Sequence, residues 1–207
     1  MIKKVLLSTA YLAPIQYYTK FLKYDEVYIE MKENFIKQSY RNRCKIYGAN
    51  GELSISIPIK KTSTKIKIKD VQIDYDTKWQ KLHWKSIESA YSSSPFFEFY
   101  EDDLKAFYER KYKFLIDLNA EIQKVILENL DLQIDFKYTE EFNQLANEKF
   151  IDLREIIHPK KKVIDPEFKP VKYTQVFYDK YGFIPNLSII DLLFNEGPNA
   201  IELLKQC

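Results

Sequence analysis

The feature that most constrains the fold is a strand, a turn, a helix and a second strand at the start of the chain. Val5–Ser8 is a short apolar run typical of a buried strand, and the turn Thr9–Ala13 follows it. Pro14 suits the beginning of a helix because its fixed φ fits there, and helical spacing continues over Ile15–Tyr24. Glu26–Glu30 then forms a second strand. Two strands joined by a helix pair in parallel, so this segment predicts a βαβ unit.

The following segment predicts an antiparallel hairpin. Apolar residues have strand-like spacing in two runs, Cys44–Tyr47 and Leu53–Ile59. The residues between these runs include Asn-Gly, the strongest short hairpin signal. Beyond residue 75 the apolar residues recur at helical spacing, with one long amphipathic stretch from Leu104 to about Asn129. A short strand over Leu132–Tyr138 and a short helix capped by Thr139 are expected next.

We therefore predict an α/β fold: an N-terminal βαβ with a mixed sheet that includes a β-hairpin, followed by a mainly helical C-terminal half. Residues 1–75 would form the α/β part with the candidate ligand site, and residues 76–207 the helical part packed on it as one compact globular unit. Residues 155–172 contain several prolines and a basic run, which indicates a loop or an ordered arm.

Residue usage excludes several classes of site. The chain has four glycines, at positions 48, 51, 182 and 197, which cannot build a P-loop or the dinucleotide-binding fingerprint. The two histidines, His83 and His158, exclude a multi-histidine metal site, and we predict no metal. These patterns identify no cofactor.

Charge and hydropathy limit the partners and the location. The net charge is +2, so the lysine-rich segments at 60–69 and 159–162 only weakly favour nucleic acid, and we expect none as a partner. No apolar run approaches the roughly 18 residues of a membrane span. The two cysteines, Cys44 and Cys207, form no disulfide framework, which favours a cytoplasmic protein.

Two arginines are the first candidates for ligand binding. The chain has 32 basic residues, yet Arg41 and Arg43 are two of only four arginines. The planar guanidinium holds carboxylate or phosphate through two hydrogen bonds, which the lysine ammonium does not. We predict that this pair binds a small anionic substrate. The alternative is a structural ion pair with Glu30 or Glu33, and the sequence leaves both interpretations open.

The ends of the predicted parallel strands indicate further binding residues. Ligands in open α/β folds lie beyond the carboxyl ends of the strands. This rule selects the turn Thr9–Ala13, with Thr9 and Tyr11, and the segment Glu30–Asn34, with Asn34. We expect these residues to lie near the arginine pair.

His83 is the candidate catalytic residue, because a histidine can accept a proton near neutral pH. Trp79 lies one helical turn earlier, and Trp79 or Tyr91 could stack on a sugar or a base. The alternative is a half-buried histidine that merely packs against Trp79.

Four stretches resemble the WbqC-like family of bacterial proteins: LLSTAYLAPIQYYTKF, IEMKENFIKQSYRNRCKI, NGELSISIPI and WQKLHWKSIESAYSSSPFFEFY. The most specific pieces are Arg-Asn-Arg at 41–43 and the segment His83–Phe97. Many family members carry Gln-Pro after the first strand, where this chain has Ser8-Thr9-Ala10. The resemblance implies a role in modifying sugar nucleotides or glycan precursors, because such proteins are often encoded among genes for O-antigen and other surface polysaccharides.

Two functions follow as hypotheses. The first is a transferase that acts on a nucleotide-linked or lipid-linked sugar, with Arg41 and Arg43 on the anion and His83 as the base. The second is a non-catalytic binding or assembly module of the same pathway, which would meet pathway proteins through the aromatic segment 95–100 (PFFEFY) if that segment is exposed.

Overall fold

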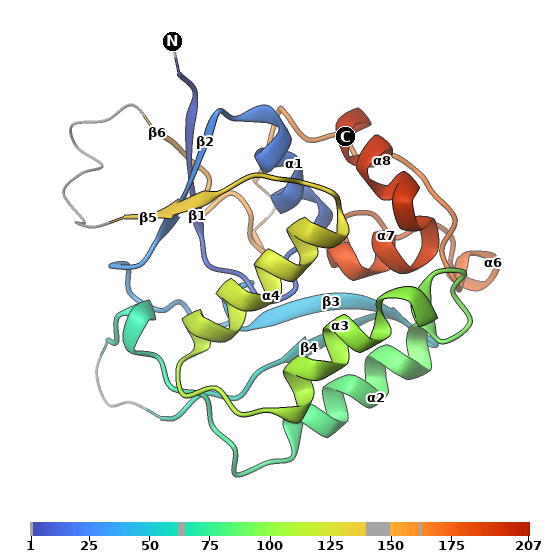
Figure 1. The fold of residues 1–207 in the computed structure, drawn as a ribbon, viewed down its shortest axis with the longest axis horizontal. Coiled ribbons are helices and arrows are strands. Elements are labelled where there is room, and N and C mark those ends of the chain that lie inside the picture. The colour runs from blue at the N-terminus through green and yellow to red at the C-terminus, as the bar shows by residue number, and fades with distance from the viewer. Residues whose placement is uncertain (1, 62–64, 140–149, 162) are drawn as a thin grey trace.

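A parallel four-stranded sheet organises the computed structural model, which describes residues 2–61, 65–139, 150–161 and 163–207. The strand order is β5-β2-β1-β6, and every neighbouring pair is parallel. The strands are β1 (Lys4–Ser8), β2 (Glu26–Glu30), β5 (Phe136–Tyr138) and β6 (Phe150–Asp152). Figure 1 shows this sheet on one side of the molecule and the helices α2 and α3 on the opposite side.

The predicted βαβ unit is confirmed. Helix α1 (Ile15–Lys23) connects β1 to β2, and the two strands pair in register from Lys4 with Glu26 to Ser8 with Glu30. The apolar run of β1 is fully buried between its neighbours β2 and β6, as is typical of strands inside parallel sheets. The α/β fold class is therefore as expected from the sequence.

The predicted hairpin forms a two-stranded antiparallel sheet of its own. Strands β3 (Arg43–Gly48) and β4 (Gly51–Ser56) pair from Arg43 with Ser56 to Gly48 with Gly51. Gly51 has φ 96°, which a residue with a side chain rarely adopts, so the glycine is required at this turn. The hairpin packs on α2, and the Lys45 carbonyl accepts a hydrogen bond from the Ser188 N–H at 2.8 Å.

The long amphipathic stretch is divided into two helices. The α-helices that the structure describes in this half are α2 (Trp79–Tyr91), α3 (Phe97–Glu109), α4 (Leu115–Asn129), α6 (Tyr178–Tyr181), α7 (Ile189–Glu196) and α8 (Ala200–Gln206). Between α3 and α4 the backbone is extended, because the Lys113 carbonyl bonds the Ile73 N–H and the Leu115 N–H bonds the Val71 carbonyl. Helical spacing alone could not show this pairing with a distant segment.

The parallel sheet takes strands from both halves of the chain. β5 and β6 follow the helices α2 to α4 in sequence but pair with β2 and β1. The strand expected at 132–138 is only the three-residue β5, and the short helix expected after Thr139 lies outside the described residues. The division at residue 75 stays a prediction, and strand pairing crosses it.

Residues 155–172 are irregular where they are described, as expected for an arm. Buried Lys20 on α1 holds this arm through Asp165, with Nζ 2.6 Å from Oδ2.

Within the described ranges, no helix combines the length and the apolar character needed to cross a membrane.

Candidate functional site

The candidate site lies at the carboxyl ends of β1 and β6. In the order β5-β2-β1-β6 the chain leaves β1 toward β2, whereas β6 lies on the other side of β1. Ligands in open α/β sheets bind at such a point. A small hollow opens there, and it is lined by Ser8, Thr9, Arg41, Arg154 and Ile157, among others.

The turn after β1 is held tightly against its neighbours. The Tyr11 N–H donates to the Tyr40 carbonyl at 2.9 Å, and the Ser188 hydroxyl donates to the Leu12 carbonyl at 2.8 Å. Leu12 has φ 41°, a left-handed conformation that is costly for a leucine. Such backbone strain persists only where surrounding contacts maintain it, and it is common at functional sites.

Arg41 is the most buried charged group at the hollow. Its Nε donates to Glu33 Oε1 at 2.8 Å, and its Nη2 donates to Glu33 Oε2 and to Ser8 Oγ, both at 2.7 Å. Arg41 is only 2% exposed and Glu33 7%. The ion pair considered from the sequence is therefore present, with Glu33 and not Glu30 as its carboxylate.

Thr9 and Arg41 share one neighbour on α4. Asn119 Nδ2 donates to the Thr9 hydroxyl at 3.2 Å and to the Arg41 carbonyl at 2.8 Å. Its Oδ1 is buried and accepts no hydrogen bond from the described residues. The amide thus ties the turn after β1 to the arginine loop.

Arg154 follows β6 and is the second arginine at the hollow. Its Nε and Nη2 donate to the Asp152 carboxylate at 2.9 and 2.6 Å, and its Nη1 lies 3.8 Å from Glu30 Oε2. Glu30 is fully buried at the end of β2, where its Oε1 accepts from the Lys32 N–H and the Thr139 hydroxyl. Within the described part of the chain, nothing donates a hydrogen bond to its Oε2.

His158 extends the site along the arm. Its Nδ1 accepts the N–H groups of Lys160 and Lys161 at 3.1 and 3.2 Å, so the neutral ring carries its proton on Nε2. Burial and the Lys161 charge lower the pKa of His158, and the charge of Arg41 contributes in the same direction. The arm also reaches the arginine loop through a hydrogen bond from Lys160 Nζ to Gln38 Oε1.

The charges of this site are mixed. Arg41 faces Glu33, and Arg154 faces Asp152 and Glu30. No group of three histidine, cysteine, aspartate or glutamate side chains is placed to hold a metal ion in the residues that the structure describes. The polar groups that line the hollow, whose volume is about 10 Å³, are the guanidinium groups of Arg41 and Arg154 and the hydroxyls of Ser8 and Thr9.

His83 lies elsewhere, in a cluster beneath the hairpin with Tyr11, Trp79 and Tyr108, here called the hairpin cluster. Its Nδ1 is 3.1 Å from the Tyr11 hydroxyl, which is 2.6 Å from the Tyr108 hydroxyl, and the ring also bonds the Ser56 backbone. The Trp79 and His83 rings meet edge to face at 5.0 Å. Burial lowers the pKa of His83 to about 4.

A family model matches residues 9–161 and 160–203 of the chain. The protein belongs to the WbqC-like protein family. It is 28% identical over 217 residues to Rv1507c, an uncharacterised protein of Mycobacterium tuberculosis, and this similarity covers 93% of the present chain and 90% of the relative. No solved structure matches the chain.

The remaining predicted residues of this WbqC-like protein lie apart from the hollow. Arg43 is half-buried on the hairpin and donates from Nε to Ser56 Oγ at 3.0 Å. The buried Tyr91 hydroxyl donates to Asp191 Oδ1 at 2.8 Å, and exposed Asn34 forms an isolated bridge with Lys67. The structure therefore brings Thr9 and Arg41 together at the hollow, which Arg43, Tyr91 and Asn34 do not line.

Sequence reasoning missed Arg154 and His158. Arg154 is one of the four arginines, so the same scarcity that drew attention to Arg41 was a usable signal for it. The strand before it, β6, has only three residues and leaves too weak a pattern to predict.

The aromatic segment 95–100, considered from the sequence as a surface for pathway proteins, is partly buried. Phe97 and Tyr100 are buried, while Phe99 is 74% exposed.

Proposed function

We propose that this WbqC-like protein is a cytoplasmic transferase that acts on a nucleotide-linked or lipid-linked sugar in the synthesis of surface polysaccharide. The phosphate of that substrate would bind at the sheet-end site, defined as Ser8, Thr9, Arg41, Arg154 and His158. One observation carries the proposal: two of the chain's four arginines line one hollow at the carboxyl ends of adjacent parallel strands.

The arginines are placed to share their N–H groups between protein and ligand. Arg41 uses Nε and Nη2 on Glu33 and Ser8, which orients the guanidinium without occupying all five of its N–H donors. Arg154 uses Nε and Nη2 on Asp152, while its Nη1 stands 3.8 Å from Glu30. Phosphate oxygens accept such bonds strongly because both partners are charged.

The hydroxyl and imidazole groups complete a phosphate site. Ser8 ends β1 and Thr9 follows it, and the neutral His158 ring carries an Nε2 proton as a further donor. A transfer reaction gains most when donors of this kind are fixed before the charge develops on the leaving phosphate. The packed turn and the Arg41–Glu33 pair provide such fixed positions.

Proton transfer in this proposal is assigned to Glu30, with His83 as the competing candidate. Glu30 Oε2 lies beside Arg154 and has no hydrogen-bond donor among the described residues. His83 already bonds the Tyr11 hydroxyl and the Ser56 backbone, and its pKa of about 4 makes it a weak base at neutral pH. Glu30 would take the proton from the attacking hydroxyl or amine.

Isothermal titration with UDP, GDP, CDP and their hexose conjugates tests the binding step. We expect Arg154→Gln to abolish binding of the nucleotide that the natural protein binds. Arg110→Gln is the matched control, because Arg110 is also an arginine paired with a carboxylate, Glu121, but does not line the hollow. Equal affinity of both variants, or no binding of any nucleotide or lipid-linked pyrophosphate, would contradict the proposal.

Incubation with a bound donor and extracted glycan precursors, read by mass spectrometry, tests the chemical step. Loss of product in Glu30→Gln with donor binding retained supports Glu30 as the base, whereas loss only in His83→Gln supports His83. A protein that binds the donor but forms no product under any condition is the non-catalytic module considered as the alternative.

A further inference from the structure

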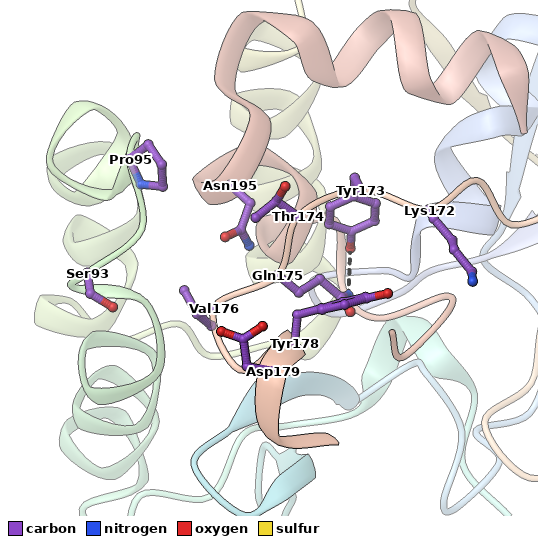
Figure 2. A pocket seen from close by; sticks show the side chains of 10 residues that line it. All are labelled: Ser93, Pro95, Lys172, Tyr173, Thr174, Gln175, Val176, Tyr178, Asp179 and Asn195. Atoms are coloured by element: carbon purple, nitrogen blue, oxygen red, sulfur yellow. Dashed lines mark hydrogen bonds between the residues drawn. The ribbon is translucent and has the colours of Figure 1, made fainter. Parts of the chain in front are cut away.

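A second, larger groove is lined by residues other than those of the sheet-end site. It has a volume of about 600 Å³, within the range usual for small-molecule sites. Figure 2 shows its two walls: Ser93 and Pro95 come from the junction of α2 and α3, and residues 172–179 with Asn195 of α7 face them. None of the sheet-end residues lines this groove.

The floor of the groove is rigid because it is bonded to a buried carboxylate. Asp191 is fully buried on α7, and its Oδ2 accepts hydrogen bonds from the Tyr173 hydroxyl and from Gln175 Nε2. Gln175 also binds both backbone groups of Ile184, accepting its N–H at 2.9 Å and donating to its carbonyl at 3.0 Å. Side chains fixed in this way lose little freedom when a ligand binds.

The rim is held from below as well. The Tyr47 hydroxyl lies 3.0 and 2.8 Å from the carbonyl oxygens of Phe177 and Gly182 and shares its one O–H between them, which braces both ends of the short helix α6. Tyr178, the first residue of that helix, is 44% exposed and lines the groove; Figure 2 shows its ring edge-on beside Tyr173. An aromatic face on a braced element is a preformed stacking surface.

The polar groups of the groove are of the kind that binds hydroxyls. They comprise the amide of Asn195, the carboxylate of Asp179 and the hydroxyls of Ser93 and Thr174, whereas the Gln175 amide is already bonded to Asp191 and Ile184. Among the described residues that line the groove, Lys172 and Asp179 are the only charged side chains, and their charges are opposite. The groove therefore does not select for an anion.

We propose that this groove binds an uncharged carbohydrate, with the C–H face of a sugar ring on Tyr178 and its hydroxyls on Asp179 and Asn195. Planar amide and carboxylate groups pair with neighbouring hydroxyls, and an aromatic ring covers the apolar face of the sugar. This inference goes beyond the sheet-end transferase site, uses different residues and does not depend on it.

The test is a titration of the ¹⁵N-labelled full-length protein with methyl glycosides of neutral hexoses, 6-deoxyhexoses and N-acetylhexosamines, followed by backbone amide shifts. We expect saturable shifts at Thr174, Val176 and Asp179. Tyr178→Ala should weaken binding by roughly tenfold, because it removes the stacking surface. Tyr181→Ala is the matched control: Tyr181 is 42% exposed on the same helix but does not line the groove, so binding should not change.

Asp179→Asn separates hydroxyl recognition from attraction of a positive charge. It keeps a planar group with hydrogen-bonding capacity, so affinity for a neutral glycoside should stay within about threefold. Absence of shifts with every glycoside, or equal affinity of Tyr178→Ala and the natural protein, would overturn the proposal. Arg154→Gln should leave glycoside binding intact, so failure here and failure of the sheet-end site are distinguishable.

Discussion

The sheet-end site and the hairpin cluster both contain residues that the sequence singled out, yet their chemistry differs. The sheet-end site places charged pairs beside a hollow, and neighbouring Glu30 has a buried carboxylate oxygen without a donor in the described structure. The hairpin cluster is uncharged, and its Tyr11, Trp79 and His83 are buried. Its histidine bonds a tyrosine hydroxyl and a backbone group, while Trp79 Nε1 has no partner among the described residues. A polar residue is available for function when its neighbours leave it bonding capacity, whatever its type.

Among these variants, removal of Arg41 at the sheet-end site should have the largest effect on the free energy of unfolding. Arg41→Met leaves the Glu33 carboxylate buried without its partner, so we expect a loss of about 3–5 kcal/mol in the free energy of unfolding. Urea denaturation measures it. The double variant Arg41→Met with Glu33→Met should recover most of the loss, because replacing both partners removes the unpaired charge. A loss below about 1 kcal/mol in the single variant would show that the pair is not buried in solution.

Lower pH should weaken the hairpin cluster. Burial lowers the pKa of His83 to about 4 in the folded protein, while the unfolded chain titrates near 6.5. The unfolded state therefore binds more protons between these values, and stability falls as the pH drops from about 6.5 toward 4, by up to roughly 3 kcal/mol.

Denaturant midpoints at a series of pH values, with His83→Gln as the control that cannot titrate, measure this dependence. The variant should lose the His83 part of the slope. NMR titration should also show His83 neutral well below pH 6, and a value near 6.5 would contradict its burial.

Loss of one hydroxyl should have a smaller effect in the hairpin cluster. Tyr11→Phe removes the partner of both His83 Nδ1 and the Tyr108 hydroxyl, which leaves buried polar groups unpaired. We expect a loss of about 1–3 kcal/mol in the free energy of unfolding. Nucleotide affinity at the sheet-end site should be unchanged, and a parallel loss of affinity would mean that the two regions act together.

The smallest stability effect is expected at Arg154. Its pair with Asp152 is partly exposed, with 16% and 48% of the side chains accessible, and such pairs contribute at most about 1 kcal/mol. Loss of this exposed pair should change the midpoint of thermal unfolding little, while anion binding is lost; any larger drop in Arg154→Gln would come from the positive charge that Arg154 places 3.8 Å from the Oε2 of fully buried Glu30. A large drop in stability would instead give Arg154 a structural role like that of Arg41.

Local patterns predicted the elements that depend on local interactions. The apolar run, the turn and the amphipathic helix of the first thirty residues specified the βαβ unit, and Asn-Gly specified the hairpin. The extended link between α3 and α4 was not predictable, because its backbone bonds residues 71 and 73, some forty positions earlier. The sequence predicted β5 as a longer strand, over 132–138, and did not predict β6; each strand has three residues.

For the site, the sequence alone predicted arginine as the chain's means of holding an anion, because it lacks the glycines and histidines for other means. It also indicated that the turn after the first strand would contribute. Tertiary structure decided which residues meet: β6 carries Arg154 to the end of β1, and the hairpin covers His83. These placements depend on contacts between segments distant in the chain, so the spacing of residues within one segment does not predict them.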